Sequence, residues 1–182
     1  CRASGLIGQD PARYDGFAYG NISLRAARGF VISGTQTGGR SALTRADLAW
    51  VMDFDAAHNR LRASGPVRPS SEAMTHGQLY QALPWANAVI HAHCAPIWQQ
   101  AATLGLPLTA RAAGYGTPQM ADEVQRLVRA MPAHAPGVLV MGGHDDGVIA
   151  FGSDMHSAGT ALLDTLTRAR ALPGVASDQG AG

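Results

Sequence analysis

The chain has 182 residues, of which 46% are hydrophobic, so it is long enough for one domain with a buried core. Its formal net charge is +1 and its arginines are scattered, whereas nucleic-acid binders gather basic residues on one face or in a run. No apolar run approaches the roughly 20 residues that span a bilayer, and the first residues show no signal-peptide pattern.

The first half of the sequence predicts strands joined by short turns. Four segments are short alternating or apolar runs bounded by turn residues, which is the pattern of strands: residues 21–25, 29–33, 50–55 and 60–63. Residues 34–39 form a glycine-rich turn after the second of these segments. Thr44 is expected to cap a short helix that carries Leu48.

The second half mixes helices with strands. Three apolar runs predict strands: residues 88–94, 138–141 and 148–151. Helices are expected over three segments: residues 97–104, 120–131 and 158–171. An earlier helix is capped by Ser70 or Ser71 and ended by Pro84. Because several strand pairs are close in sequence, we predict an α/β fold of three layers, α/β/α, with a largely antiparallel central sheet. We expect one domain over residues 1–172, followed by a small, polar and flexible C-terminal tail over residues 173–182.

The sharpest local feature is the pair His91 and His93 in a predicted strand. Side chains two apart on a strand point to the same face, so both imidazoles would project together, close enough to share a metal. The alternative is two surface histidines on a half-exposed strand. The apolar residues 88–90 favour a buried strand, where two imidazoles without a metal are costly to satisfy. We therefore interpret the pair as metal ligands.

Two ligands do not complete a site, because catalytic zinc typically uses three protein ligands and one open position. The candidates for the third ligand are His144, Asp146, Glu72, His76, His134, His156 and Cys94. His144 stands in a turn between two apolar strands, a position from which a side chain can reach a cleft. His134 lies in a proline-flanked loop and is expected to be exposed. Cys94 points to the opposite face from His93, into the core.

Glu72 follows a pair of serines at the expected start of a helix. Serine hydroxyls together with the free N–H groups of a helix start suit an oxyanion or a phosphate. Simple helix capping by Ser70, Ser71 and Glu72 is the competing interpretation.

The absence of lysine excludes one class of chemistry. All 14 basic residues are arginine, so neither a Schiff-base aldolase nor an enzyme that anchors pyridoxal phosphate is possible. A carbanion next to a carbonyl then needs another stabiliser, and a metal Lewis acid is the obvious one. The two cysteines, Cys1 and Cys94, are few and far apart, which suits the reducing cytoplasm better than a disulfide scaffold.

Five motifs, in this order and spacing, resemble the class II aldolase/adducin family over roughly residues 15–170. The matching segments are residues 20–25 (GNISLR), 31–38 (VISGTQTG), 69–72 (PSSE) with His76, 89–93 (VIHAH) and 142–147 (GGHDDG). Members of this family usually assemble as tetramers with active sites at subunit interfaces. The resemblance therefore implies a class II aldolase-like fold and a homotetramer.

The resemblance also implies roles for individual residues. It implies a zinc ion, or another divalent cation such as Mn²⁺, Co²⁺ or Fe²⁺, held by three histidines that include His91 and His93. It assigns Glu72 as the catalytic acid/base. Tyr115 is either a second proton donor or a loop aromatic packed on the core. The implied phosphate cradle is Gly20, Asn21, Thr37, Gly38, Ser70 and Ser71, with Gly34 and Thr35 as the alternative glycine and threonine.

The third zinc ligand departs from the family pattern, in which a histidine stands directly before a glycine. Here the order is His144, Asp145, Asp146, Gly147, so an aspartate precedes the glycine. Residues 144 and 146 could share a face if the segment is extended. Zinc's preference for nitrogen favours His144, and Asp146 is the alternative.

These features predict a metal-dependent lyase of the aldolase type that cleaves or rearranges a small sugar, expected to be a sugar phosphate, in carbohydrate metabolism. The metal would stabilise an enediolate while Glu72 moves a proton. A related epimerase, dehydratase or decarboxylase is an alternative, because these reactions share enediolate chemistry. A non-catalytic adducin-like binding module is a second alternative. Two other classes of protein that use a His-x-His pair do not fit. A cupin site expects a glutamate soon after the second histidine, which this sequence lacks, and an amidohydrolase barrel needs a longer chain.

Overall fold

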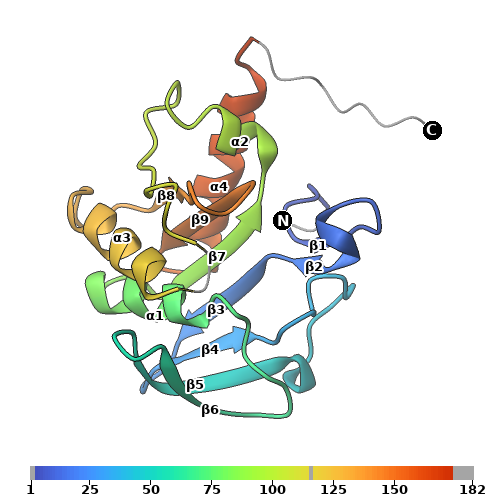
Figure 1. Cartoon of the computed structure of the whole chain (residues 1–182), viewed down its shortest axis with the longest axis vertical. Coiled ribbons are helices and arrows are strands. Elements are labelled where there is room, and N and C mark those ends of the chain that lie inside the picture. The colour runs from blue at the N-terminus through green and yellow to red at the C-terminus, as the bar shows by residue number, and fades with distance from the viewer. Residues whose placement is uncertain (1–2, 115–116, 174–182) are drawn as a thin grey trace.

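The computed structural model describes residues 3–114 and 117–173 (Figure 1). Seven strands of the described chain form the central sheet, in the order β6-β5-β4-β3-β7-β9-β8, and each neighbouring pair runs antiparallel. They are β3 (Asn21–Arg25), β4 (Phe30–Ser33), β5 (Leu48–Asp55), β6 (Arg60–Ser64), β7 (Ala88–His93), β8 (Gly137–Val140) and β9 (Gly147–Gly152). A separate ribbon pairs β1 (Gly8–Gln9) with β2 (Ala18–Tyr19). The predicted C-terminal tail lies outside the described residues apart from Pro173.

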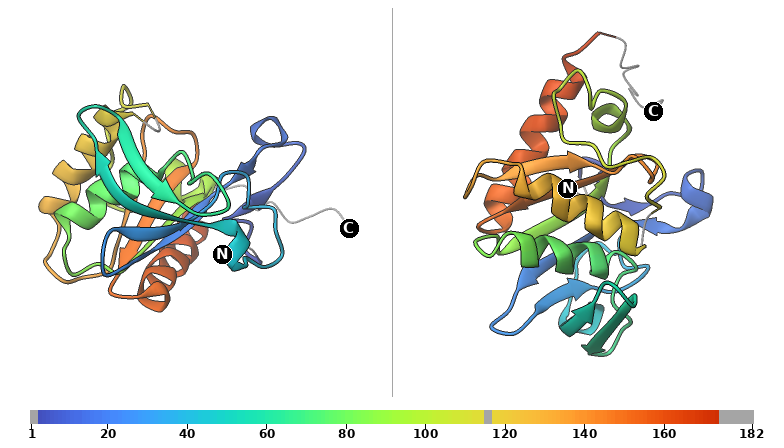
Figure 2. Two further views of the ribbon diagram at one scale, coloured as in Figure 1. Left: turned by 90° about the horizontal axis from the view of Figure 1, so that it is seen from below. Right: turned by 60° about the vertical axis from the view of Figure 1, so that its left-hand side comes forward.

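Helices cover both faces of the sheet and complete three layers (Figure 2). They are α1 (Ala73–Ala82), α2 (Ala95–Gln99), α3 (Pro118–Arg129) and α4 (Met155–Arg170). On one face, α1 and α3 pack together over a core that includes Val89 and Ile149 of the sheet. On the other face, α2 and α4 pack over Ile90 and Ala150. The predicted α/β/α architecture with a largely antiparallel sheet is confirmed. None of the described helices is long and apolar enough to cross a membrane.

Capping side chains set where α3 and α4 begin. The hydroxyl of Thr117 accepts the N–H of Met120 at 3.3 Å, and a proline occupies the first turn of α3. The Asp154 carboxylate accepts the N–H of Ser157 at 2.7 Å. These caps set the first turn of two helices that pack on opposite faces of the sheet.

The segment after Thr44 differs from the prediction. Only Arg45–Asp47 form a short 3-10 turn, and Leu48 begins β5 instead of lying in a helix. The Asp47 carboxylate accepts hydrogen bonds from the N–H and the hydroxyl of Thr44, at 2.8 and 2.9 Å, which closes the turn. Leu48 then pairs with Ser33 of β4. Thr44 is the cap residue, as predicted, but the prediction of a helix that carries Leu48 is wrong, because sheet pairing begins directly after the turn.

Two helix boundaries also differ. The helix predicted over residues 97–104 covers Ala95–Gln99. Neither Ser70 nor Ser71 is the cap residue of α1, because Glu72 occupies that position. The Ser70 hydroxyl instead accepts the N–H of Glu72 at 3.3 Å, so this serine fixes the backbone just ahead of the helix.

Candidate metal centre

Strand β7 runs through the middle of the sheet and is buried along its whole length. Ile90 and Ala92 face the core beneath α4, whereas Val89 faces the core beneath α1 and α3. The alternation of a strand therefore directs His91 and His93 to the side of α1. Their ring centroids lie 5.1 Å apart, so the two imidazoles project from one face side by side.

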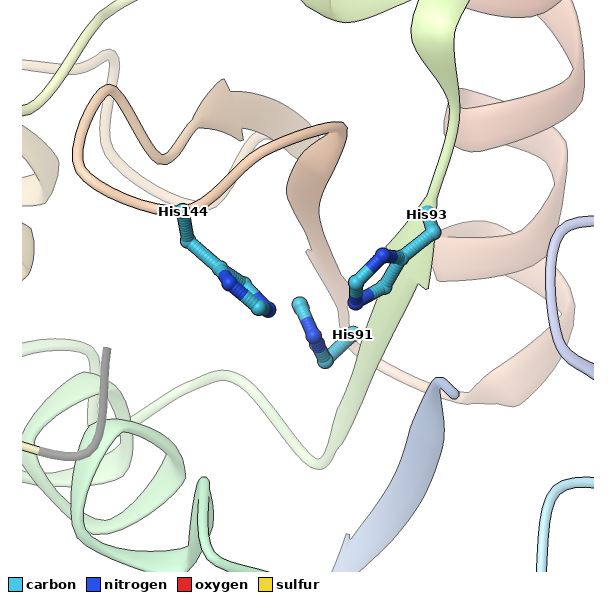
Figure 3. A group of neighbouring side chains, drawn as sticks. All are labelled: His91, His93 and His144. Carbon is cyan, nitrogen blue, oxygen red and sulfur yellow. The ribbon is translucent and has the colours of Figure 1, made fainter. Parts of the chain in front are cut away.

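His144 reaches the same place from the turn between β8 and β9. This turn is closed by the His144 N–H donating to the Met141 carbonyl at 3.1 Å and the Gly147 N–H donating to the His144 carbonyl at 2.9 Å. The His144 ring centroid lies 5.2 Å from that of His91 and 4.6 Å from that of His93. Figure 3 shows the three rings converging from the strand and the turn.

The residue before His144 is a glycine for a steric reason. A Cβ atom on Gly143 would lie 1.9 Å from the carbonyl oxygen of Ala113, well inside van der Waals contact. The turn can pass this close to the loop after α2 only without a side chain. Gly143 therefore helps to set the position from which His144 enters the site.

The three histidines have the donor atoms that a metal needs. One ring nitrogen from each lies within 4.8 Å of the others, and no other group among residues 3–114 and 117–173 meets the same criterion. The Nδ1–H of His91 donates to the Val148 carbonyl at 3.2 Å, which leaves Nε2 as the free lone pair. Nδ1 of His93 is buried and has no hydrogen-bond partner within the described chain. Three imidazole nitrogens fit the donor preference of zinc.

Burial keeps these rings neutral, as ligands must be. It lowers the pKa of His93 to about 3, with the neighbouring His144 adding to the effect. Burial also lowers the pKa of His91 well below its ordinary value, and the charges of His93 and His144 would lower it further. The pKa of His144 is lowered by burial too, although Asp145 and Asp146 oppose the shift.

Asp146, the alternative third ligand, has other partners. Its carboxylate accepts a hydrogen bond from the Tyr14 hydroxyl at 2.7 Å and lies 3.7 Å from an Arg13 nitrogen. It is not part of the group of possible metal ligands found in the described chain. The arrangement therefore favours His144 as the third ligand.

Glu72, at the cap position of α1, is a buried carboxyl group with one oxygen uncommitted. Its side chain is 3% exposed, and Oε2 accepts the Thr75 hydroxyl at 3.0 Å. Oε1 is buried and lacks a hydrogen-bond partner in the part of the chain that the structure describes. Burial raises the pKa of Glu72 to about 7, although the bond from Thr75 opposes the shift. A carboxyl group of this kind can both take and give a proton near neutral pH.

One cavity, of about 680 Å³, joins most of the predicted site residues. Its walls include Gly20, Asn21, Ser70, Ser71, Glu72, His91, His93 and His144. Gly34 and Thr35 also line it, whereas Thr37 and Gly38 line a neighbouring cavity of about 240 Å³ that shares Gly20 and Asn21 with the first. The Thr37 hydroxyl is turned to the backbone and donates to the Gly34 carbonyl at 2.7 Å. Gly34 and Thr35 therefore share a cavity with the three histidines, and Thr37 and Gly38 do not.

Some residues of the cavity were not predicted, and one predicted residue lies outside the described part of the chain. Tyr115 is that residue. Tyr14, Asp15 and Tyr19 line the cavity without carrying a sequence signal of their own, because each stands in an irregular or very short element. Proximity to the motif that begins at Gly20 was the only hint available.

Comparisons with known proteins identify the family of the chain. The sequence pattern of the class II aldolase and adducin N-terminal domain matches residues 10–171. The L-ribulose-5-phosphate 4-epimerase UlaF of Salmonella paratyphi B is 28% identical over 165 residues. That alignment covers 78% of this chain and 69% of the epimerase.

Solved structures show the same fold. The l-fuculose-1-phosphate aldolase from Thermus thermophilus superposes with a TM-score of 0.59 at 23% identity, over 92% of this chain and 82% of that one. The sugar-phosphate aldolase from Thermotoga maritima superposes with a TM-score of 0.68 at 13% identity, over 93% of this chain and 87% of that one. With the match over residues 10–171, the chain belongs to the class II aldolase and adducin N-terminal domain family.

Proposed function

We propose that this protein is a metal-dependent lyase of the aldolase type, which cleaves a small sugar phosphate at the bond between the carbon beside the carbonyl group and the next, hydroxyl-bearing carbon. The observation that carries the proposal is the placement of three neutral imidazoles and one buried carboxyl group on the walls of a single cavity. A metal site alone would also suit a non-catalytic binding protein. A buried carboxyl group with one unbonded oxygen, however, destabilises the fold, and its presence on the same cavity is explained by a role in proton transfer.

His91, His93 and His144 would hold the divalent cation, and zinc suits this donor set best. Such a cation supplies the positive charge that stabilises the enediolate of a carbonyl substrate. The bond from His91 to the Val148 carbonyl fixes the orientation of that ring before any ion binds. Burial of His91 and His93 keeps their ring nitrogens unprotonated.

Glu72 would transfer the proton. Its pKa near 7 allows the carboxylate to accept a proton from a substrate hydroxyl or carbon and to return it later in the cycle. The Thr75 hydroxyl holds Oε2, so Oε1 is the oxygen available for this step. Because Glu72 begins α1, its backbone is fixed by the helix rather than by a loop.

The phosphate end of the substrate would lie against neutral donors. Asn21, Ser70, Ser71 and Thr35 line the cavity, and none of its described lining residues is an arginine. Hydroxyl, amide and backbone N–H groups can hold a phosphate in this way. This arrangement supports a substrate with one phosphate group rather than a strongly anionic one.

Epimerisation is the second candidate reaction, favoured by the similarity to a 4-epimerase. Cleavage and epimerisation can both begin with the same proton transfer by Glu72, so the residues around it do not separate them. They differ in products: cleavage releases an aldehyde, whereas epimerisation inverts one hydroxyl-bearing carbon and releases nothing.

A product assay on the zinc-loaded protein tests the proposal. A panel of ketose and aldose phosphates is incubated with wild type and Glu72→Gln, aldehyde release is followed with a coupled dehydrogenase, and epimers are resolved by chromatography. We expect aldehyde from at least one phosphate, and a loss of about 10²–10⁴-fold in kcat for Glu72→Gln with its zinc content retained. Turnover that is equal in the two proteins, or absent from the whole panel, would contradict the proposal.

A further inference from the structure

Behind Glu72, a chain of buried polar groups runs along α1 into the interior. Glu72, His76 and Tyr80 are spaced by four residues, so they lie on one face of this helix. Ser23 of β3 lies beneath them, with its hydroxyl 2.7 Å from Nδ1 of His76 and 2.8 Å from the hydroxyl of Tyr80. His76 is 0% exposed, Ser23 2% and Tyr80 4%, so water does not compete for these bonds.

The direction of these hydrogen bonds depends on which atoms of Tyr80, Ser23 and His76 carry a hydrogen. Burial raises the pKa of Tyr80 to about 12, so its phenol keeps its hydrogen at neutral pH. Burial lowers the pKa of His76 to about 3, so its ring is neutral and only one of its nitrogens carries a hydrogen. If Tyr80 donates to Ser23 and the Ser23 hydroxyl donates in turn to Nδ1 of His76, all three groups are paired and the ring hydrogen lies on Nε2.

The opposite direction leaves the phenol unsatisfied. If Nδ1 of His76 donated to Ser23, and Ser23 to Tyr80, the phenol hydrogen would lack a hydrogen-bond acceptor among the described residues. A buried donor without an acceptor costs about 1–3 kcal/mol. The direction from Tyr80 to His76 leaves one buried group in need of a partner, the Nε2–H of His76, whereas the opposite direction leaves two, the phenol hydrogen and the Nε2 lone pair, so we infer that Nε2 is a donor.

The acceptors for this donor are at the cavity. Nε2 of His76 is buried without a partner in the described chain, as are Oε1 of Glu72 and Oδ1 of Asn21. Asn21 precedes Ser23 by two residues on the same face of β3 and pairs with His91, and Glu72 precedes His76 by one turn of α1. His76 also lies close enough to His91 to affect the pKa of that ring. One uncommitted nitrogen thus lies one helical turn from the uncommitted oxygen of Glu72 and two strand residues from that of Asn21.

We propose that His76 is a positioning residue for Glu72: Tyr80 and Ser23 fix the Nε2–H form of its ring, which donates to Oε1 of Glu72, directly or across one water molecule. Thr75 and His76, the third and fourth residues after Glu72, then hold its two carboxylate oxygens. This fixes the plane of the carboxylate toward the substrate. Catalytic hydrogen bonds are often long in the free enzyme and tighten in the complex. The inference rests on the proposed role of Glu72 as the proton carrier.

The ring tautomer is tested first, by long-range ¹H–¹⁵N NMR of the zinc-loaded full chain labelled in its 7 histidines. The spectrum of His76→Asn assigns the His76 signals. We expect a protonated Nε2 and an unprotonated Nδ1 at pH 7, and a rise in the other tautomer in Tyr80→Phe, which removes the first donor. A protonated Nδ1 in the wild type, or a spectrum unchanged in Tyr80→Phe, would overturn the assignment.

Kinetics of two His76 variants separate positioning from packing. In His76→Asn the new amide takes the place of Nδ1, whereas the longer side chain in His76→Gln places an N–H near the position of Nε2. We expect His76→Asn to lower kcat about 10–100-fold with KM and zinc content unchanged, and His76→Gln to restore most of that loss. Gln81→Asn, on the exposed side of α1, is the control and should match the wild type.

Two kinetic results would overturn the proposal: wild-type kcat in His76→Asn, or a glutamine variant that folds and binds zinc but is as slow as the asparagine variant. Failure of the proposed function has a different signature. If the wild type turns over no sugar phosphate, that function fails, and the NMR experiment still decides the tautomer of His76.

Discussion

Tyr14 donates a 2.7 Å hydrogen bond to the carboxylate of Asp146, although 132 positions separate the two residues in sequence. Arg13 donates to the same phenol oxygen at 2.7 Å. The Tyr14 ring also stands edge-on against His93, with ring centroids 4.4 Å apart. The bond therefore ties the N-terminal segment to the turn that carries His144 and builds the wall of the site beside His93.

A double-mutant cycle on this pair measures its contribution to stability. Burial and the bond to Asp146 raise the pKa of Tyr14, so the phenol remains a donor at neutral pH. We expect Tyr14→Phe and Asp146→Ala each to lower the free energy of unfolding by about 1–2 kcal/mol in urea titrations. The double variant should lose about 1 kcal/mol less than the sum of the two. Strictly additive losses would show that the two side chains do not interact in solution.

The burial of Glu72 predicts a pH dependence of stability in the metal-free protein. Its pKa rises from an ordinary 4.5 to about 7 on folding, so between these values the folded chain holds a proton that the unfolded chain has released. Stability therefore falls as pH rises through this window, by up to about 3 kcal/mol.

Comparison with Glu72→Gln isolates this carboxyl group, because the buried histidines contribute equally to both proteins. Their lowered pKa values act in the opposite direction and remove stability as pH falls below the ordinary value of 6.5. Relative to the wild type, we expect the free energy of unfolding of the glutamine variant to rise by about 2–3 kcal/mol between pH 4.5 and pH 8. A difference that does not change with pH would mean that Glu72 is solvated.

Two glycine substitutions test how the turn places His144. Gly143→Ala would force the chain away from the Ala113 carbonyl, so we expect at least about tenfold weaker zinc binding and a loss of about 1–3 kcal/mol of stability. Gly159→Ala in α4 is the matched control, because a Cβ there meets nothing within 4 Å. This variant should bind zinc as the wild type does, and its free energy of unfolding should rise by about 0.5–1 kcal/mol. Equal zinc affinity in the two variants would contradict the steric argument.

Thr35 and Thr37 are expected to differ in function. Thr35 lines the cavity of the metal centre, so Thr35→Val should raise KM for a sugar phosphate by about tenfold and leave KM for the unphosphorylated sugar nearly unchanged. The Thr37 hydroxyl is bonded to the Gly34 carbonyl, so Thr37→Val should instead lower stability by about 1 kcal/mol. Steady-state kinetics with both substrates, together with urea titration, decide the matter. A larger KM effect from Thr37→Val would favour the threonine that the sequence resemblance implies.

The parts of the fold that rest on periodicity could be predicted from the sequence. Successive side chains of the strand that carries His91 and His93 point to opposite faces, and this alternation predicts that both rings lie on the same face. The helix Pro118–Arg129 shows apolar residues at helical spacing, and two of these, Val124 and Val128, are buried.

Features that depend on contacts between distant segments could not be predicted. No local pattern places Tyr14 against His93, because the contact depends on a bond to a turn at the other end of the chain. The choice between His144 and Asp146 was likewise ambiguous from spacing, and it is the partner of Asp146 that favours His144. The orientation of Thr37 could not be predicted either, because its hydroxyl donates to a backbone carbonyl within its own turn.

Metal content is the most direct test of the site. Wild type, His144→Ala and Asp146→Ala are loaded with zinc, freed of excess metal by dialysis and analysed by inductively coupled plasma mass spectrometry. If the three imidazoles form the site, wild type and Asp146→Ala should each hold about one zinc per chain, and His144→Ala should hold less than about a tenth of that. Full occupancy in His144→Ala, or its loss in a folded Asp146→Ala, would contradict this.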